Sequence, residues 1–273
     1  MKKRQYDIDM CSGSLADKIL LFALPLMASS LLQLLFNAAD VVVVGRFAGK
    51  EALAAVGSNT SLINLMVNLF VGLSVGANVV IARDLGAGRQ EEAHRSVCTT
   101  VALALASGLG LMVFGVVMVR QLLELMRSPA DVIDLASVYL RIYFCGMPAN
   151  MLYNFGAAIL RAKGDTRRPL YFLTIAGVAN VVLNLFFVIV CHLDVAGVGL
   201  ATIISQYISA ILVLYCLMGE EGPLRLSIKE LRLEGTVIKR ILRVGLPAGF
   251  QGIVFSLSNV VIQSSINSFD SAA

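Results

Sequence analysis

Residues 19–45 read ILLFALPLMASSLLQLLFNAADVVVVG, an apolar run with a single charge, Asp40. A helix needs about 20 apolar residues to cross the hydrocarbon core of a bilayer, so this run is long enough to span a membrane. It is too long for the apolar part of a cleavable signal peptide, and no small-residue cleavage pattern follows it. We therefore expect it to remain in the protein as a membrane anchor.

Further runs of similar length follow along the chain, and only one of them contains a charge, Arg141. Hydrophobic residues make up 58% of the chain and charged residues 15%, against about 45–50% and about 25% in soluble domains. These values exclude disordered, collagen-like and nucleic-acid-binding classes, and they predict an all-α polytopic membrane protein. The further runs are 54–81, 97–119, 135–160, 169–191, 195–219 and 244–269.

A long polar stretch divides the first six runs from the seventh. Leu24-Pro25 in the first run aligns with Leu246-Pro247 in the seventh. This suggests a second repeat of six helices in the same orientation, as in parallel-repeat transporters, and hence a chain that is a fragment of a protein about twice as long. A complete seven-helix protein is the alternative. The expected divisions are an N-terminal segment (1–18), a lobe of six transmembrane helices (19–219), an inter-lobe loop (220–241) and the first helix of an incomplete second lobe (242–273).

The distribution of basic residues predicts the orientation in the membrane. With the N-terminus inside, 17 of the 22 Lys and Arg residues lie in segments on the inner side. Such an excess is typical of cytoplasmic segments, so we expect a multi-pass protein of the plasma membrane with a cytoplasmic N-terminus and a cytoplasmic 220–241 loop. This topology explains the basic charge without a nucleic-acid partner.

Asp40 is the most informative residue of the first run. A carboxylate at membrane depth costs about 2.5–3.5 kcal/mol, so it usually faces a cavity and marks a proton or ion path. Gln33 and Asn37 precede it at helical spacing and share its face. We predict that Asp40 couples transport to a proton or another cation, with Gln33 and Asn37 lining the cavity. The alternative is that Asp40 only reaches the outer headgroups.

Amides and small residues form similar stripes in other runs. Amide groups within lipid must be paired, so these faces should turn inward. Asn180 and Asn184, one turn apart, can offer carbonyl oxygens to a cation. Together with Asp40 they are a candidate site for Na⁺. The stripe that includes Gly72 and Gly76 is better interpreted as a helix–helix contact.

Pro25 and Pro148 each remove a backbone hydrogen bond from a predicted helix, so a bend or local unwinding is expected there. For Pro25 the alternatives are a hinge coupled to Asp40 and a static kink.

Catalytic and metal-binding patterns are absent from the sequence. There is no Walker A, GxSxG or HExxH motif, so an enzyme is not predicted. The five cysteines and two histidines are scattered and no CxxC occurs, so we expect neither a disulfide framework nor a zinc site. No cofactor is expected beyond H⁺ or Na⁺ as coupling ion.

Several segments together resemble the MATE (multidrug and toxic compound extrusion) transporters. Asn180 and Asn184 match polar positions of that family's fifth helix. The other matching segments are Leu24-Pro25, Leu35-Phe36-Asn37-Ala38-Ala39-Asp40, Val44-Gly45-Arg46, Arg161-Ala162-Lys163-Gly164-Asp165-Thr166 with Pro169, and Gly245-Leu246-Pro247.

The resemblance implies twelve helices in two lobes and export of drug-like, often cationic, organic compounds in exchange for H⁺ or Na⁺. It implies that Asp40 is the coupling group and that Asn154, Asn180, Asn184 and Thr202 line the cavity of the first lobe. The missing second lobe would then be a required partner. The alternatives are a lipid-linked-sugar flippase of the same superfamily, a membrane-embedded enzyme and a non-transporting half-protein.

Overall fold

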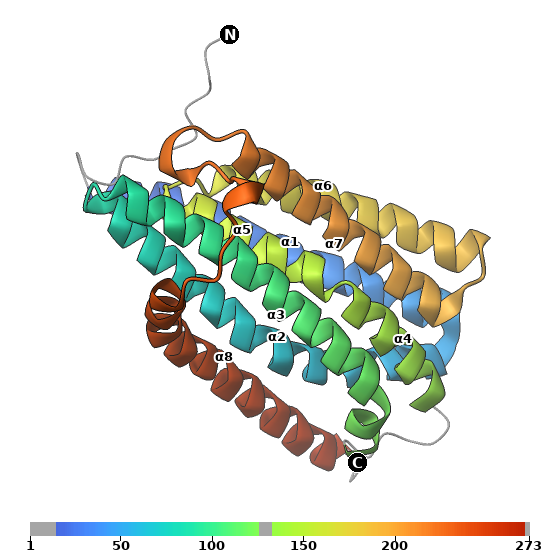
Figure 1. The fold of residues 1–273 in the computed structure, drawn as a ribbon. Coiled ribbons are helices and arrows are strands. Elements are labelled where there is room, and N and C mark those ends of the chain that lie inside the picture. The colour runs from blue at the N-terminus through green and yellow to red at the C-terminus, as the bar shows by residue number, and fades with distance from the viewer. Residues whose placement is uncertain (1–14, 126–132, 271–273) are drawn as a thin grey trace.

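The computed structural model describes residues 15–125 and 133–270, and every regular element within these ranges is a helix. The long helices pack side by side in a bundle, with α8 along one edge (Figure 1). The elements are α1 (Leu15–Val43), η1 (Val44–Ala48), α2 (Gly49–Gly86), α3 (Gln90–Leu125), α4 (Ile133–Cys145), α5 (Met147–Ala162), α6 (Arg167–Leu185), η2 (Phe186–Val190), α7 (Asp194–Met218), η3 (Gly222–Leu224), η4 (Ile228–Glu230) and α8 (Gly235–Asp270).

The outer surface of the bundle is apolar. Leu34 on α1 is 65% exposed and Ile211 on α7 is 62% exposed, among many other large apolar side chains. Such a surface needs lipid to cover it. Five helices in the described part of the chain are long and apolar enough to cross a membrane: Ala16–Phe47, Met66–Gly86, Gln90–Glu124, Arg167–Val190 and Asp194–Met218.

The apolar run 135–160 does not form one helix. It is divided at Gly146 into α4, with 13 residues, and α5, with 16 residues, so neither helix alone reaches the length of a span. Pro148, which has no backbone N–H, lies at the start of α5, and a Cβ atom at Gly146 would overlap the amide of Gln206. The expected unwinding near Pro148 is therefore present. By contrast, α1 continues through Pro25 without interruption, so the hinge stays a prediction.

The polar stretch before the seventh run is shorter than predicted. The helix α8 begins at Gly235 rather than near Leu242, because Val237 and Ile241 are already buried in the core and their side chains hold the first turns in place. We call residues 219–234 the linker, and the end of the bundle where it lies the linker end. The linker contains the two short turns η3 and η4.

Glycines bring α8 into close contact with α2. A Cβ atom at Gly245 would lie 2.7 Å from the Cα atom of Leu73, and one at Gly249 would lie 2.8 Å from the carbonyl oxygen of Leu69. On the opposing helix, Cβ atoms at Gly72 and Gly76 would overlap the backbone of α8. Small residues four apart on both helices let two backbones approach closely, as in membrane helix pairs, and the predicted contact role of Gly72 and Gly76 is confirmed.

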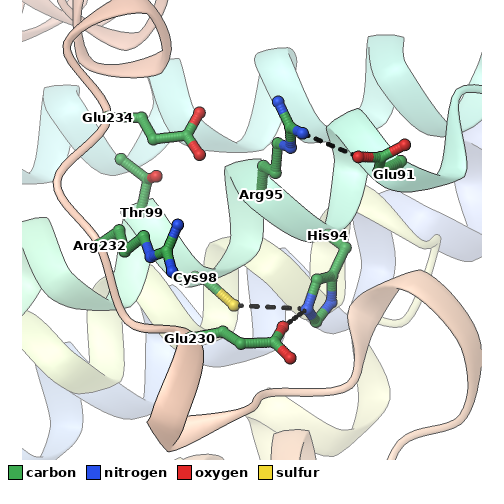
Figure 2. A pocket seen from close by; sticks show the side chains of 8 residues that line it. All are labelled: Glu91, His94, Arg95, Cys98, Thr99, Glu230, Arg232 and Glu234. Atoms are coloured by element: carbon green, nitrogen blue, oxygen red, sulfur yellow. Dashed lines mark hydrogen bonds and ion pairs between the residues drawn. The ribbon is translucent and has the colours of Figure 1, made fainter.

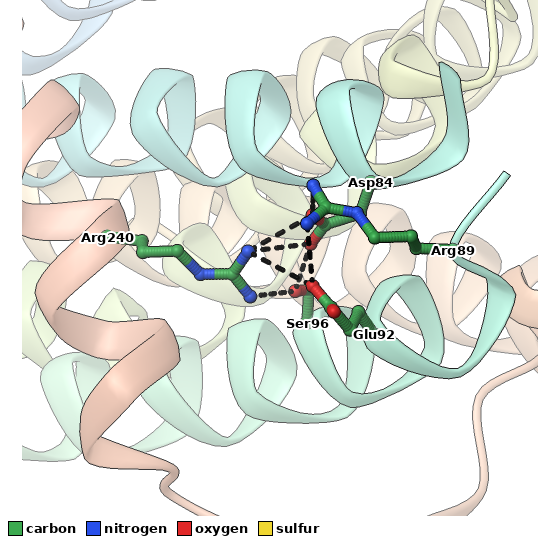
Figure 3. Close-up of polar contacts among 5 residues, drawn as sticks. All are labelled: Asp84, Arg89, Glu92, Ser96 and Arg240. Atoms are coloured by element: carbon green, nitrogen blue, oxygen red, sulfur yellow. Dashed lines mark hydrogen bonds and ion pairs between the residues drawn. The ribbon is translucent and has the colours of Figure 1, made fainter. Parts of the chain in front are cut away.

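A buried ion network holds the same two helices together at the linker end. Asp84 of α2 is fully buried and accepts hydrogen bonds from Arg240 Nη1 at 3.0 and 3.2 Å (Figure 3). Ser96 Oγ and Arg89 Nη2 each donate to Asp84 at 3.0 Å, and Glu92 lies 3.3 Å from Arg89. A buried carboxylate needs such a complete set of donors, so this network ties α2, α3 and α8 into one unit.

Candidate functional site

Polar side chains from five helices line a cavity of about 260 Å³ that is open at the surface, where Gln33 and Asn37 are exposed. It lies among α1, α4, α5, α6 and α7, because each of these helices turns its polar stripe toward the same place. The predicted lining residues Gln33, Asn37, Asp40, Asn154, Asn180 and Thr202 line it. Asn184, also predicted to line it, does not, because it is completely buried behind Asp40. The other lining residues are Phe36, Tyr139, Tyr143, Asn150, Tyr153, Leu173, Ala176, Gly177, Ser205, Gln206 and Ser209.

Asp40 forms the main polar contact between α1 and α6. Asn184 Nδ2 donates a hydrogen bond to Asp40 Oδ1 at 2.5 Å and lies 3.4 Å from Asn180 Oδ1. Asn184 is completely buried, and its own Oδ1 atom has no hydrogen-bond partner. Asp40 therefore lines the cavity beside two amides, and the alternative in which it only reaches the outer headgroups does not fit this geometry.

This arrangement offers oxygen atoms to a small cation. The carboxylate of Asp40, the amide oxygen of Asn180 and the unpartnered amide oxygen of Asn184 are the ligand types that hard cations prefer. The same carboxylate can instead accept a proton. Either outcome changes the charge of the carboxyl that accepts the hydrogen bond from Asn184, the contact that links α1 to α6.

A glycine of α6, Gly177, lets the Phe36 ring of α1 pack against the α6 backbone close to Asp40. A Cβ atom at Gly177 would overlap the ring of Phe36, so the ring lies directly on the helix backbone there. Phe36 is one turn before Asp40 on α1, and Gly177 is about two turns before Asn184 on α6. The aromatic contact therefore brings the two helices together at the place where the polar contact forms.

Two π-helical segments flank this contact. The segment η1 begins four residues after Asp40, and η2 begins two residues after Asn184. The two segments also contact each other. Short π-helical segments are rare in proteins, and those that occur often lie at functional sites, where they interrupt the regular helical hydrogen-bond pattern.

Aromatic residues of the cavity were missed by the sequence analysis. Tyr139 and Tyr143 line it with ring centroids 6.1 Å apart, and Tyr153 lies on the next helix. Their faces can attract a cationic ligand. The four-residue spacing of Tyr139 and Tyr143 in an apolar run was a signal that could have found them. Nearby, Asn154 Nδ2 donates to Asn150 Oδ1 at 2.9 Å.

Comparisons with known proteins agree with this architecture. The profile of the MatE family matches residues 25–186. The chain is 30% identical over 260 residues to the probable multidrug resistance protein YoeA of Bacillus subtilis. The matched region is 93% of this chain and 56% of that protein. The chain therefore spans about half the length of the curated relatives that it matches.

Solved structures of MATE family transporters also resemble this chain over about half of their own length. An outward-facing multidrug resistance MATE family transporter superimposes with a TM-score of 0.83 and 27% identity, over 90% of this chain and 55% of that one. An inward-facing structure of such a transporter superimposes with a TM-score of 0.76 and 28% identity, over 82% of this chain and 51% of that one.

Proposed function

Because the chain belongs to the MatE family, a family of membrane transporters and not of enzymes, we propose that it forms the ion- and substrate-binding lobe of a secondary antiporter. In this proposal the transporter exports drug-like, often cationic, organic compounds across the cell membrane in exchange for H⁺ or Na⁺. The observation that carries the proposal is the contact of Asp40 with Asn184 in a polar cavity.

The chemistry of the cavity supports a cationic substrate. Of the described residues that line it, Asp40 is the only one with a formal charge, and three tyrosines surround the same space. A carboxylate attracts an organic cation, and aromatic faces add to this attraction without demanding one molecular shape. A flippase for lipid-linked sugars would have to bind a pyrophosphate, which calls for cationic side chains that this lining does not contain.

Coupling follows from competition for one carboxylate. A proton or Na⁺ on Asp40 cancels the charge that attracts the organic cation, so ion entry lowers the affinity for the substrate. The same ion also weakens the hydrogen bond from Asn184, because the acceptor loses its negative charge, and this links ion binding to the position of α1 against α6. Such a difference in affinity between two states is what a transporter needs to exchange one cation for the other.

We also propose that a second lobe completes the transporter and that the linker end of the bundle faces the cytoplasm. The basis of this proposal is the length of the relatives, of which this chain matches about half, and the excess of basic residues at the linker end. We expect that end to be cytoplasmic, and we expect transport to require the second lobe, since alternating access moves one repeat against the other.

An efflux assay with Asp40→Asn tests the proposal. Asparagine has nearly the same size but cannot bind a proton or carry the charge, so ion-driven efflux of a fluorescent organic cation such as ethidium should fall to the level of cells without the transporter. The matched control is Asp134→Asn, because Asp134 is an exposed acid at the start of α4. The assay uses the protein as the cell produces it, with expression measured by immunoblot. The coupling role would be contradicted if the Asp40→Asn variant still exported ethidium and this export stopped when the ion gradients were removed.

A further inference from the structure

Three metal-ligand side chains meet outside the cavity, at the linker end of the bundle. His94 and Cys98 lie one turn apart on α3, and Glu230 lies on the short turn η4 of the linker (Figure 2). Their ligand atoms all lie within 4.8 Å of one another. The sequence analysis expected no metal site, because it could not see that the linker returns to α3.

The imidazole of His94 is oriented as a metal ligand usually is. Its Nδ1 atom lies 3.3 Å from the carbonyl oxygen of Pro223, and a carbonyl can only accept a hydrogen bond. A ring that donates from Nδ1 to this carbonyl presents the lone pair of Nε2 to the other two groups, which Nε2 faces. Histidines that bind metals commonly donate their second ring nitrogen to a backbone carbonyl or a carboxylate in this way.

Three ligand atoms of different kinds face one another in this cluster. His94 Nε2 lies 2.5 Å from Glu230 Oε2 and 3.8 Å from Cys98 Sγ. A proton on Nε2 would satisfy the carboxylate alone, and the Cys98 sulfur would keep only its hydrogen bond with the backbone of Ser227. A metal ion would bind nitrogen, oxygen and sulfur together. Tetrahedral zinc holds nitrogen and sulfur ligands about 3.6 Å apart, which is close to the separation of His94 Nε2 and Cys98 Sγ. The Glu230 carboxylate lies closer to His94 than a ligand of the same ion would, so it has to move back when the ion binds.

The surroundings give an ion both charge and access. The cluster opens into a hollow of about 520 Å³, so the ion can enter and a water molecule can complete its coordination. Cys98 is almost fully buried at the base of the hollow, whereas the Glu230 side chain is 59% exposed and can adjust its distance. Glu91 neutralises Arg95 at 2.8 Å. Glu234 and Arg232 also line the hollow, so the acids Glu91, Glu230 and Glu234 outnumber the two arginines by one.

We propose that His94, Cys98 and Glu230 form a binding site for Zn²⁺ that fastens the linker to α3. Zinc fits best because a nitrogen, a thiolate and a carboxylate together suit a borderline-soft ion that prefers four ligands. The linker leads directly into α8, so an ion bound here restrains the joint between the six-helix lobe and α8. Metal binding and docking of the linker then support each other, because the complete ligand set exists only when the linker is docked.

Metal-binding measurements on the purified 273-residue chain without an affinity tag test the site. We expect one Zn²⁺ per chain after dialysis, and Co²⁺ in its place should give a thiolate-to-metal absorption band. Cys98→Ser and His94→Gln should each weaken binding by about 100-fold. Cys191→Ser and His192→Gln are matched controls, because both residues are exposed and distant in sequence from the cluster, and they should leave binding unchanged.

Two measurements on the unaltered chain keep the test independent of how the variants fold. Zn²⁺ should protect Cys98 from alkylation by N-ethylmaleimide, with mass spectrometry identifying the modified cysteine. It should also slow tryptic cleavage of the linker at Arg225, Lys229 and Arg232. The proposal is overturned if the chain binds no stoichiometric Zn²⁺, or if the His94 and Cys98 variants bind it as tightly as the two controls.

Discussion

Close contact between α2 and α8 predicts that a single methyl group will weaken the bundle. In Gly245→Ala the new Cβ atom would lie 2.7 Å from the Cα atom of Leu73, whereas ordinary contacts begin at 3.4 Å. The helices must therefore separate by about 0.3 Å to reach 3.0 Å, the shortest contact that Cβ atoms show, and by about 0.7 Å to reach an ordinary contact. Because the obstacle is backbone, no side-chain rotation can relieve it. Overpacking of this kind costs about 1–3 kcal/mol, and separation also removes dispersion contacts along the interface.

The opposing effect is helix propensity, which favours Ala over Gly by about 1 kcal/mol. Gly110→Ala isolates this effect, because a Cβ atom at Gly110 of α3 meets nothing within 4 Å. We expect Gly245→Ala to be less stable than Gly110→Ala by about 2 kcal/mol, or roughly 4–8 °C in Tm. Gly245→Leu should widen the difference and Gly110→Leu should not. Thermal unfolding of the purified variants, followed by size-exclusion chromatography, measures this, and equal Tm values for the two alanine variants would refute the close contact.

Two further predictions concern the linker end and the cavity. Burial by itself raises the pKa of the Glu220 carboxyl, but hydrogen bonds from Arg168 and from Lys163, at 3.1 Å, outweigh burial and hold the pKa below its usual value. The stabilisation by Glu220 is thus complete above the unfolded-state pKa of about 4.3 and is lost as the pH falls through the lower folded-state value. Glu220→Gln should flatten the dependence of Tm on pH in that acidic range, and an unchanged profile would exclude this role. In the cavity, Gly177→Ala should displace the Phe36 ring, separate Asp40 from Asn184 and impair efflux. Adding Phe36→Ala should restore part of the activity, and failure to do so at normal expression would argue against this positioning.

Much of the cavity could be predicted because burying a polar group in lipid is costly. Asp40 and its helical neighbours Gln33 and Asn37 stand out in an apolar run, and the same reasoning applies to Asn180 and Asn184. The sequence analysis grouped Asp40 with Asn180 and Asn184, but it did not give the direct hydrogen bond from Asn184 to Asp40, since these residues are 144 positions apart and many polar pairings satisfy the same stripes. The tyrosines were missed because an aromatic residue in an apolar run is compatible with lipid as well as with a cavity.

The sequence by itself determined that this chain is a helical membrane protein, since long uncharged runs leave the backbone no other way to satisfy its hydrogen bonds in lipid. It also determined where most helices lie and that one carboxylate is placed at membrane depth. Tertiary structure alone decided which helix faces meet. Those contacts divide the 135–160 run at Gly146, seat α8 on the glycines of α2, and return the linker to His94 and Cys98. The reason is physical: periodicity in one helix reports how polar its faces are, but partners are selected by shape and by hydrogen bonds between residues far apart in the chain.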